Sequence, residues 1–252
     1  MGLCTRPVKY IHFEEISSTH IYAMANGAFL SDFTVITADH QSDGRGRLGR
    51  KWISSAGDSL LASVLLKPSI TLQEASLLTP VLSVAICEYL DEFDLACSIR
   101  WPNDVMVGER KIAGILSEAS YSDKLEFVVA SFGLNVRQKE GALALIDRPA
   151  TSIYSEKGRL LDPKSLCSPM ISHFASLYFD FLKSGADSFF NRWEKRMSMI
   201  GREVSIDTGK ERIDGKVLKF YKNGSIEVRD LGGVSHRFHA GEILRVGPRG
   251  RV

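Results

Sequence analysis

The chain has 252 residues and a mass of 27.9 kDa, enough for one large domain or for one domain with a small second one. It is 44% hydrophobic and 25% charged, which excludes long disordered stretches. A net charge of +2 is too small to make the whole chain a nucleic-acid-binding protein. Residues 1–10 lack the apolar core of a signal peptide, and no apolar run is long enough to span a membrane.

The four cysteines, Cys4, Cys87, Cys97 and Cys167, form no C-x-x-C pair. Scattered cysteines in a chain of this length indicate reduced thiols. We therefore expect a cytoplasmic protein with neither a cysteine metal site nor a disulfide framework.

The first part of the chain alternates strand and helix signals. Residues 8–16 predict a strand, Ser18 and Thr19 can cap a helix over 20–28, and residues 33–38 predict a second strand. The apolar run 59–66 predicts a buried strand, and 72–93 predicts a helical region in which Pro80 makes a kink or a fresh start.

Hairpin signals dominate the middle of the chain. A short strand ends at Trp101-Pro102, a turn at Gly108-Glu109 leads to a strand over 110–119, and another turn leads to a strand over 125–136. Consecutive hairpins imply a largely antiparallel sheet and argue against a parallel nucleotide-binding fold.

The pattern changes again towards the C-terminus. Asp162-Pro163 predicts the start of a helix reaching residue 183, and a shorter helix is predicted over 186–199. Short strands follow, and their ranges are 203–207, 212–220, 225–229 and 234–239. We expect an α+β fold with a mixed, largely antiparallel sheet flanked by helices over residues 1–199. A small β-barrel is expected over residues 200–252.

The stretch from Asp43 to Trp52 holds three glycines, three arginines and a lysine within ten residues. Glycine permits close backbone approach, and arginine offers a planar fork of donors to phosphate or carboxylate. The stretch therefore predicts a flexible anion clamp, with Trp52 as an anchor or wall. A solvated basic loop or a nucleic-acid patch is the alternative interpretation.

Two standard phosphate-binding motifs overlap this stretch, and neither fits. Gly44, Gly46 and Gly49 have G-x-G-x-x-G spacing, but no helix pattern follows and no acidic residue occupies the ribose position. The P-loop interpretation fails because Arg50-Lys51 stands where Lys-Ser/Thr is required.

Four motifs in order resemble those of biotin protein ligases. They are Gln41 with Gly44-Arg-Gly-Arg-x-Gly-Arg-x-Trp52, Trp101-Pro-Asn-Asp104, Lys111-Ile-Ala-Gly114-Ile-Leu and Gly133-Leu-Asn135. Arg192-Trp193-Glu194 and Gly241-Glu242-Ile243 also resemble the family's last helix and C-terminal barrel. The resemblance covers about residues 8–245 and implies a class II aminoacyl-tRNA synthetase-like catalytic domain with an SH3-like barrel. With the catalytic domain expected almost from Met1, the chain resembles the monofunctional class that lacks a DNA-binding domain.

The resemblance implies an ATP-dependent ligase. Biotin's carboxylate would attack the α-phosphate of ATP to give biotinyl-5′-AMP and pyrophosphate, and a lysine of a carrier protein would then displace AMP. The implied carrier is the biotin carboxyl carrier subunit of acetyl-CoA carboxylase, and Mg²⁺ would accompany ATP. Members of this class are often homodimers, although no residue here requires a dimer.

The resemblance also implies roles for particular residues. Arg45, Arg47 and Lys111 would be catalytic, together with Asp104, and Asn135 would lie near the metal. Biotin or its adenylate would be held by Ser18, Thr19, Gln41, Gly44, Arg45, Arg47, Arg50, Trp52, Lys111, Gly114 and Gly133. The glycine- and arginine-rich loop would close over the adenylate, and we expect it to be poorly ordered without ligand.

Several alternatives stay open from the sequence. Ser18 and Thr19 fit simple helix caps, Trp52 fits a core aromatic, and Asp104 after Pro102 fits ordinary turn chemistry. The chain also departs from the common pattern, with Arg100 where lysine is usual and Ser131 where glycine is frequent.

Three other functions remain to be weighed. A lipoate protein ligase of related fold also adenylates an acid. An octanoyl transferase would need a nucleophilic cysteine, and no cysteine lies in the motifs. A nucleic-acid-binding module would need a wider basic surface than 32 Lys+Arg against 30 Asp+Glu provides.

Overall fold

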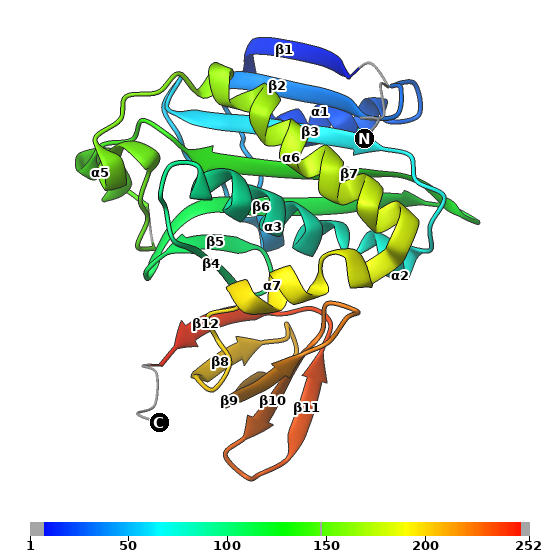
Figure 1. Ribbon diagram of the computed structural model, residues 1–252, viewed down its shortest axis with the longest axis vertical. Helices are drawn as coiled ribbons and strands as arrows, with labels where there is room; N and C mark the ends of the chain where they lie inside the picture. The colour runs from blue at the N-terminus through cyan, green and yellow to red at the C-terminus, as the bar shows by residue number, and fades with distance from the viewer. Residues whose placement is uncertain (1–7, 147, 248–252) are drawn as a thin grey trace.

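The computed structural model describes residues 8–146 and 148–247, and a seven-stranded sheet forms its larger part (Figure 1). Its strands are β1 (Lys9–Ile16), β2 (Thr34–Gln41), β3 (Ser59–Leu66), β4 (Cys97–Arg100), β5 (Asp104–Val107), β6 (Arg110–Tyr121) and β7 (Leu125–Asn135). Their order across the sheet is β1-β2-β3-β7-β6-β5-β4. Only β1 and β2 pair in parallel, which confirms the predicted mixed, largely antiparallel sheet.

Helices cover both faces of this sheet. They are α1 (Thr19–Asn26), α2 (Leu72–Ala75), α3 (Leu78–Asp91), α4 (Glu140–Leu143), α5 (Ile153–Lys157), α6 (Pro163–Ser184) and α7 (Phe190–Arg196), with single 3₁₀ turns η1 (Arg47–Gly49) and η2 (Gly185–Ser188). In Figure 1, α3 and α6 lie in front of the sheet and α1 lies behind it.

Local chemistry explains where the helices begin. Ser18 caps α1 by accepting a hydrogen bond from the Ile21 backbone, and Asp162 caps α6 with Pro163 in its first turn. The predicted helical region 72–93 divides into α2 and α3, and Pro80 lies in the first turn of α3, where a missing N–H costs no hydrogen bond.

Two parts of the helix prediction needed correction. The predicted helix 186–199 is a 3₁₀ turn followed by the seven-residue α7. The four- and five-residue helices α4 and α5 were not predicted, because such short segments carry too few apolar positions to show a helical period.

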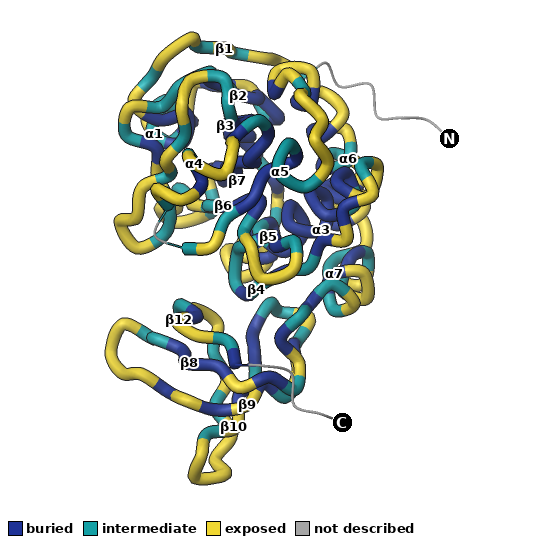
Figure 2. The backbone as a smooth tube through the Cα atoms, turned by 90° about the vertical axis from the view of Figure 1, so that its left-hand side faces the viewer, coloured by how far each residue is buried: buried dark blue, intermediate teal, exposed yellow. Residues whose placement is uncertain are grey.

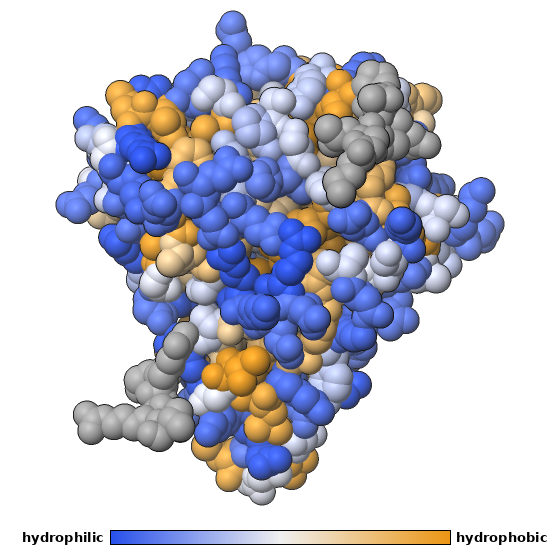
Figure 3. Space-filling view, viewed as in Figure 1, coloured by the Kyte–Doolittle hydropathy of each residue, from blue (hydrophilic) through white to orange (hydrophobic). Residues whose placement is uncertain are grey.

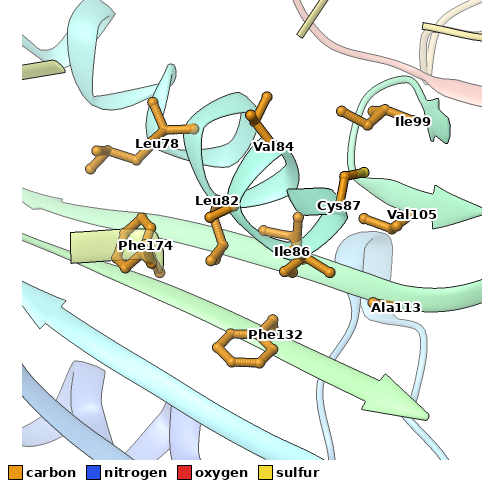
Figure 4. Packing of buried hydrophobic residues seen from close by; sticks show 14 of the residues in the cluster. Leu78, Leu82, Val84, Ile86, Cys87, Ile99, Val105, Ala113, Phe132 and Phe174 are labelled. Carbon is orange, nitrogen blue, oxygen red and sulfur yellow. The ribbon is translucent and has the colours of Figure 1, made fainter. Parts of the chain in front are cut away.

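The main core lies between the sheet and the α3–α6 layer. Leu82 and Ile86 of α3 approach Phe132 of β7, as Figure 4 shows. Because neighbouring side chains on a strand point to opposite faces, Val129 of β7 belongs instead to a smaller cluster beneath α1 that includes Ala23. The interior is dark blue in Figure 2, where it marks the buried residues.

The C-terminal part is a five-stranded antiparallel sheet. Its strands are β8 (Glu203–Asp207), β9 (Arg212–Phe220), β10 (Ile226–Asp230), β11 (Ser235–Phe238) and β12 (Glu242–Val246), in the order β11-β10-β9-β8-β12. Strand β12 was missing from the predicted strands. Trp193 of α7 packs edge-on against Phe220 of β9, with ring centroids 5.3 Å apart. The two parts therefore share apolar packing.

The face seen in Figure 3 is mainly hydrophilic, with apolar side chains gathered in separate patches. Among the described residues, no helix combines the length and apolar character needed to cross a membrane.

Candidate active site

The face of the large sheet opposite α3 and α6 carries a cavity of about 620 Å³, a size suited to a small-molecule ligand. Its floor follows from strand alternation, because Ala130, Phe132 and Leu134 of β7 fill the main core and the residues between them face the other way. Gly133 is one of these, and its register partners are Leu61 of β3 and Gly114 of β6.

The structure brings the predicted site residues together from segments far apart in the sequence. The residues that line the cavity are Ser18, Thr19, Gln41, Arg45, Arg47, Arg50, Trp52, Asp104, Lys111, Gly114, Gly133 and Asn135. Gly44 is the exception, since it supports the loop without lining the cavity. Residues that line the cavity without having been predicted include His20, Ser131, Arg148 and Glu242.

The glycine- and arginine-rich stretch forms a small hairpin over the cavity. The Trp52 backbone donates to the Gly44 carbonyl at 2.9 Å, and Gly46 donates to Arg50 at 2.8 Å. A Cβ at Gly44 would lie 2.6 Å from the Trp52 carbonyl oxygen, so this close approach requires glycine. Leu48 and Gly49 at the tip have positive φ. The poor order of this hairpin without ligand stays a prediction.

Trp52 lies directly on two glycines of the sheet. A Cβ at Gly133 would lie 2.3 Å from the indole, and one at Gly114 would lie 3.1 Å from it. Gly133 therefore needs glycine to seat the ring, whereas a Cβ at Gly114 would press mainly on the Lys111 side chain, with its Nζ 2.7 Å away. The indole Nε1 is buried and has no hydrogen-bond partner among the described residues, so the cavity wall contains an unused donor.

The cations of the site are held by acidic and carbonyl oxygens. Lys111 Nζ lies 2.5 Å from Asp104 and 5.7 Å from the centroid of the Trp52 ring. Arg47 Nη1 donates to the Gly241 carbonyl at 3.2 Å. Burial lowers the pKa of Arg47, although the nearby carboxylates of Asp104 and Glu242 act to raise it. Such half-buried cations suit an anionic ligand.

Glu242 of β12 joins the hairpin to the C-terminal sheet. Its carboxylate forms ion pairs with Arg50 of the hairpin and with Arg148. The sequence drew attention to Gly241-Glu242-Ile243 but gave no contact for it, because only the folded chain places β12 beside residue 50.

A line of polar groups runs beneath the cavity from Gln41 to Glu118. Thr19 donates to Gln41 through its backbone N–H at 2.7 Å and through its hydroxyl at 3.1 Å. Ser63 donates to Thr19 at 2.8 Å and lies 2.7 Å from the Ser131 hydroxyl. The line continues from Ser131 through His20 to Glu118, with distances of 2.8 and 3.1 Å.

The side-chain amide of Asn135, a residue predicted to lie near a metal, is hydrogen-bonded to other residues of the protein. Its Nδ2 donates to the Thr151 carbonyl at 2.9 Å, and its Oδ1 accepts from Gln138 at 3.2 Å. Among residues 8–146 and 148–247, no group of three or more His, Cys, Asp or Glu side chains could hold a metal ion. Mg²⁺ usually keeps several waters and binds through one or two carboxylates together with substrate phosphates.

The described cysteines do not contribute to the site. Cys87, Cys97 and Cys167 are free and buried, and burial raises the pKa of Cys97 to about 12 and that of Cys167 to about 11. None of the three lines the cavity, so they provide no nucleophile of the kind an octanoyl transferase needs.

The two departures from the common family pattern, Arg100 and Ser131, differ in their relation to the cavity. Arg100 does not line the cavity and pairs with Glu109 at 3.0 Å. Ser131 does line it and adds a hydroxyl to the polar line.

Comparisons with known proteins agree with this geometry. Residues 13–135 match the model of the Biotin/lipoate A/B protein ligase family. The chain is 34% identical over 228 residues to a biotin–[acetyl-CoA-carboxylase] ligase of Mycobacterium tuberculosis, covering 88% of this chain and 82% of that protein. It is 28% identical to a bifunctional ligase/repressor of Bacillus subtilis, over 91% of this chain and 72% of that protein.

A solved structure has the same architecture. The biotin protein ligase of Aquifex aeolicus in complex with biotin and ATP superposes with a TM-score of 0.78 at 29% identity, covering 93% of this chain and 97% of that one. The chain therefore belongs to the biotin protein ligase family.

Proposed function

We propose that the chain is an ATP-dependent biotin protein ligase whose reaction centre is the cavity beneath the hairpin. In the first half-reaction, a carboxylate oxygen of biotin attacks the α-phosphorus of ATP. The bond from this phosphorus to the pyrophosphate oxygen breaks, which gives biotinyl-5′-AMP and pyrophosphate. In the second, a lysine amine of a biotin carboxyl carrier protein attacks the biotinyl carbonyl, loses a proton and releases AMP.

The observation that carries this proposal is the cluster of cations over a cavity floored by glycines. Arg45, Arg47, Arg50 and Lys111 all line the cavity. Two unit charges about 4 Å apart interact by about 4 kcal/mol at an effective dielectric of about 20, so these groups can offset the repulsion between a carboxylate and a triphosphate. Negative charge grows on the α-phosphate in the transition state, which such cations stabilise preferentially.

The ion pairs around the cavity support further proposed roles. When the nucleotide binds, Arg50 would leave Glu242 and pair with phosphate. Lys111 would likewise give up part of its contact with Asp104 to pair with phosphate. The Asp104 carboxylate, released from Lys111, would orient the carrier's lysine and accept its proton. Trp52, Gly114 and Gly133 would line the biotin side of the cavity, and Ser18, Thr19 and Gln41 would supply its polar end.

Mg²⁺ is proposed as part of the substrate, bound to the phosphates of ATP. Mg²⁺ commonly binds in this way through substrate phosphates. Asn135 keeps its predicted place beside that ion as a proposal.

Three further proposals concern the roles of the two domains, the location of the protein and its oligomeric state. Residues 1–199 would act as the catalytic domain and 200–252 as an accessory barrel that holds the hairpin through Glu242. The reduced, buried state of Cys87, Cys97 and Cys167 supports a cytoplasmic location. The third proposal is that the chain forms a homodimer, which light scattering of the purified chain would detect.

ATP–pyrophosphate exchange tests the proposal and its nearest alternative together. Labelled pyrophosphate should enter ATP in the presence of biotin and Mg²⁺, and not when lipoate replaces biotin. Exchange with lipoate alone would make the chain a lipoate ligase. Exchange with neither acid would remove the support for a ligase.

A further inference from the structure

Cations outnumber carboxylates among the described residues that line the cavity. The six cations are Arg45, Arg47, Arg50, Lys51, Lys111 and Arg148, and the two carboxylates are those of Asp104 and Glu242. Arg148 lies outside the motifs that resemble the family's, so the resemblance implies no role for it. A cavity with this balance of charge suits a ligand that brings several negative charges.

The backbone next to Arg148 is attached to strand β6. The Lys111 N–H donates to the Pro149 carbonyl at 2.9 Å, and the Thr151 N–H donates to the Lys111 carbonyl at 2.9 Å. Ala150 forms a parallel bridge with Lys111, so this segment runs beside the strand at the point where Lys111 enters the cavity. A side chain that begins on such a regular element has a well-defined starting position.

Arg148 and Arg50 meet at one carboxylate. Both guanidinium groups pair with Oε1 of Glu242, whose side chain is 14% exposed. The hairpin and the segment before α5 supply the arginines, and the carboxylate comes from β12, at the edge of the C-terminal sheet nearest the large sheet (Figure 1). One carboxylate between two arginines leaves a positive charge in excess, and phosphate oxygens fit the same guanidinium forks.

Arg47 lies between the two carboxylates of the cavity. Its guanidinium is near both Asp104 and Glu242, and Lys111 pairs with Asp104 at 2.5 Å. Lys111 also lies beside Trp52, on the proposed biotin side of the cavity. In an in-line displacement the attacking and leaving oxygens lie on opposite sides of the phosphorus. With the α-phosphate between Lys111 and Arg47, the leaving pyrophosphate therefore falls at the Glu242 end.

We propose that Arg50 and Arg148 form the subsite for the leaving pyrophosphate, and that Glu242 replaces the pyrophosphate on both arginines after it departs. This inference rests on the proposed biotin ligase function and gives Arg148 a binding role. With ATP bound, the β- and γ-phosphates pair with the two arginines. After the bond to the α-phosphorus breaks and pyrophosphate leaves, Glu242 pairs with them again. The hairpin thus stays tied to the C-terminal sheet while the adenylate still needs protection from water.

Arg148→Ala tests the subsite, because the two half-reactions should respond differently. In pyrophosphate exchange, the KM for pyrophosphate and that for ATP should each rise about tenfold, since charge-assisted hydrogen bonds are lost. The KM for biotin should stay within about twofold of the wild type. Transfer of biotin from supplied biotinyl-5′-AMP to a biotin carboxyl carrier protein should keep the wild-type rate, because no pyrophosphate takes part. Arg148→Lys keeps the charge but not the fork, and its KM for pyrophosphate should rise only about threefold.

Arg192→Ala is the matched control for Arg148→Ala. Arg192 also pairs with a glutamate, and its Nε lies 2.7 Å from the Glu88 carboxylate, but neither residue lines the cavity. This variant should have the KM values of the wild type. If Arg148 served only to anchor Glu242, Arg148→Ala would slow both half-reactions and raise the KM for biotin as much as that for pyrophosphate. That result would overturn the inference.

Glu242→Gln tests the replacement of pyrophosphate by the carboxylate. Without this charge, nothing takes the place of pyrophosphate on the two arginines. Supplied biotinyl-5′-AMP should therefore leave the variant about three- to tenfold faster than it leaves the wild type or Arg192→Ala. A release rate equal to that of the wild type would overturn this part of the inference.

Direct binding separates this inference from the proposed function. In equilibrium dialysis of the whole chain with Mg²⁺, Arg148→Ala should bind labelled pyrophosphate about tenfold more weakly than the wild type. AMP carries only the α-phosphate and should bind equally to both. Equal binding of pyrophosphate, or none by the wild type, would overturn the subsite. Absence of biotin-dependent exchange would overturn the proposed function instead, and the dialysis would still test the subsite.

Discussion

Arg50, in the hairpin that covers the cavity, forms an ion pair with Glu242 in the last strand of the chain. Glu242 is also paired with Arg148, and the neighbouring Gly241 carbonyl accepts from Arg47. The C-terminal sheet thus holds the hairpin in place through one carboxylate and one carbonyl. The nucleotide phosphates would have to compete with Glu242 for Arg50.

Glu242→Gln should release the hairpin. The variant keeps the shape of the side chain and removes the charge that Arg50 and Arg148 share, so the open form should be populated more often. Tryptic cleavage at residues 45–51 should become about three- to tenfold faster, because proteolysis follows the population of the open state. Glu211→Gln, at an exposed residue of the same sheet region, is the control. Equal cleavage rates in both variants would contradict the holding role.

Gly133→Ala should displace Trp52. The added Cβ would lie 2.3 Å from the indole, so the ring must move out of its seat over the sheet. We expect kcat/KM for biotin to fall by at least about tenfold, since the displaced wall lies in the binding site. The melting temperature should change little, because Trp52 is only partly buried. A variant with wild-type kinetics would show that the seat of Trp52 is unimportant.

Leu82→Ala tests the core independently of the site. Leu82 is fully buried between α3 and the sheet, and truncation should lower the free energy of unfolding by about 3 kcal/mol through lost burial and a cavity. Denaturant titration measures the loss. The KM for biotin should stay within about twofold of the wild type, since Leu82 faces away from the cavity. A large change in the KM for biotin, measured under conditions where the variant is fully folded, would contradict this separation of core and site.

The three described cysteines should be unreactive in the folded protein. Burial raises the pKa of Cys97 to about 12 and that of Cys167 to about 11, so little thiolate exists at pH 8. In a Cys4→Ser background, a disulfide reagent should titrate these thiols only after denaturation. Fast reaction in the native state would contradict their burial.

The same shifts give a pH dependence of stability. Burial raises both folded-state pKa values above the ordinary thiol value of 9.0. Their contribution to stability is therefore fully present below about pH 9 and is lost as the pH rises towards 11 and 12, because the unfolded thiols ionise first. Denaturant titrations at pH 8 and pH 10 should show this loss. Cys97→Ala should reduce the difference.

The sequence predicted most of the sheet because its strands are marked by local signals. The range 59–66 coincides with β3, and the hairpin turns around residues 108 and 122 were placed correctly because glycine and polar residues mark them. The short helix α5 was missed since five residues carry too little periodicity. β12 was missed because its single buried residue, Ile243, leaves no alternating pattern.

The predicted site was chosen from motifs. Glu242 lies in one of the quoted motifs but was assigned no contact there, and His20 lies outside them. Arg45 and Arg47 come from a stretch of unusual composition, and Lys111 comes from a motif that resembles one of the family's, so all three could be selected before the fold was known. Glu242 and His20 could not, because their importance lies in contacts with residues far away in the chain. A lone histidine after a helix cap gives no sign that it lies beside Ser131.

Retention of the adenylate by an Arg45→Ala/Arg47→Ala variant tests the central claim most directly. The purified protein would be incubated with biotin and labelled ATP, and the labelled biotinyl-5′-AMP that stays with the protein after gel filtration would be measured. The wild type should form and retain the adenylate, whereas the variant should form it at least about a hundredfold more slowly and release what it forms. Formation and retention equal to those of the wild type would contradict the account of a cationic hairpin closing over an acyl phosphate.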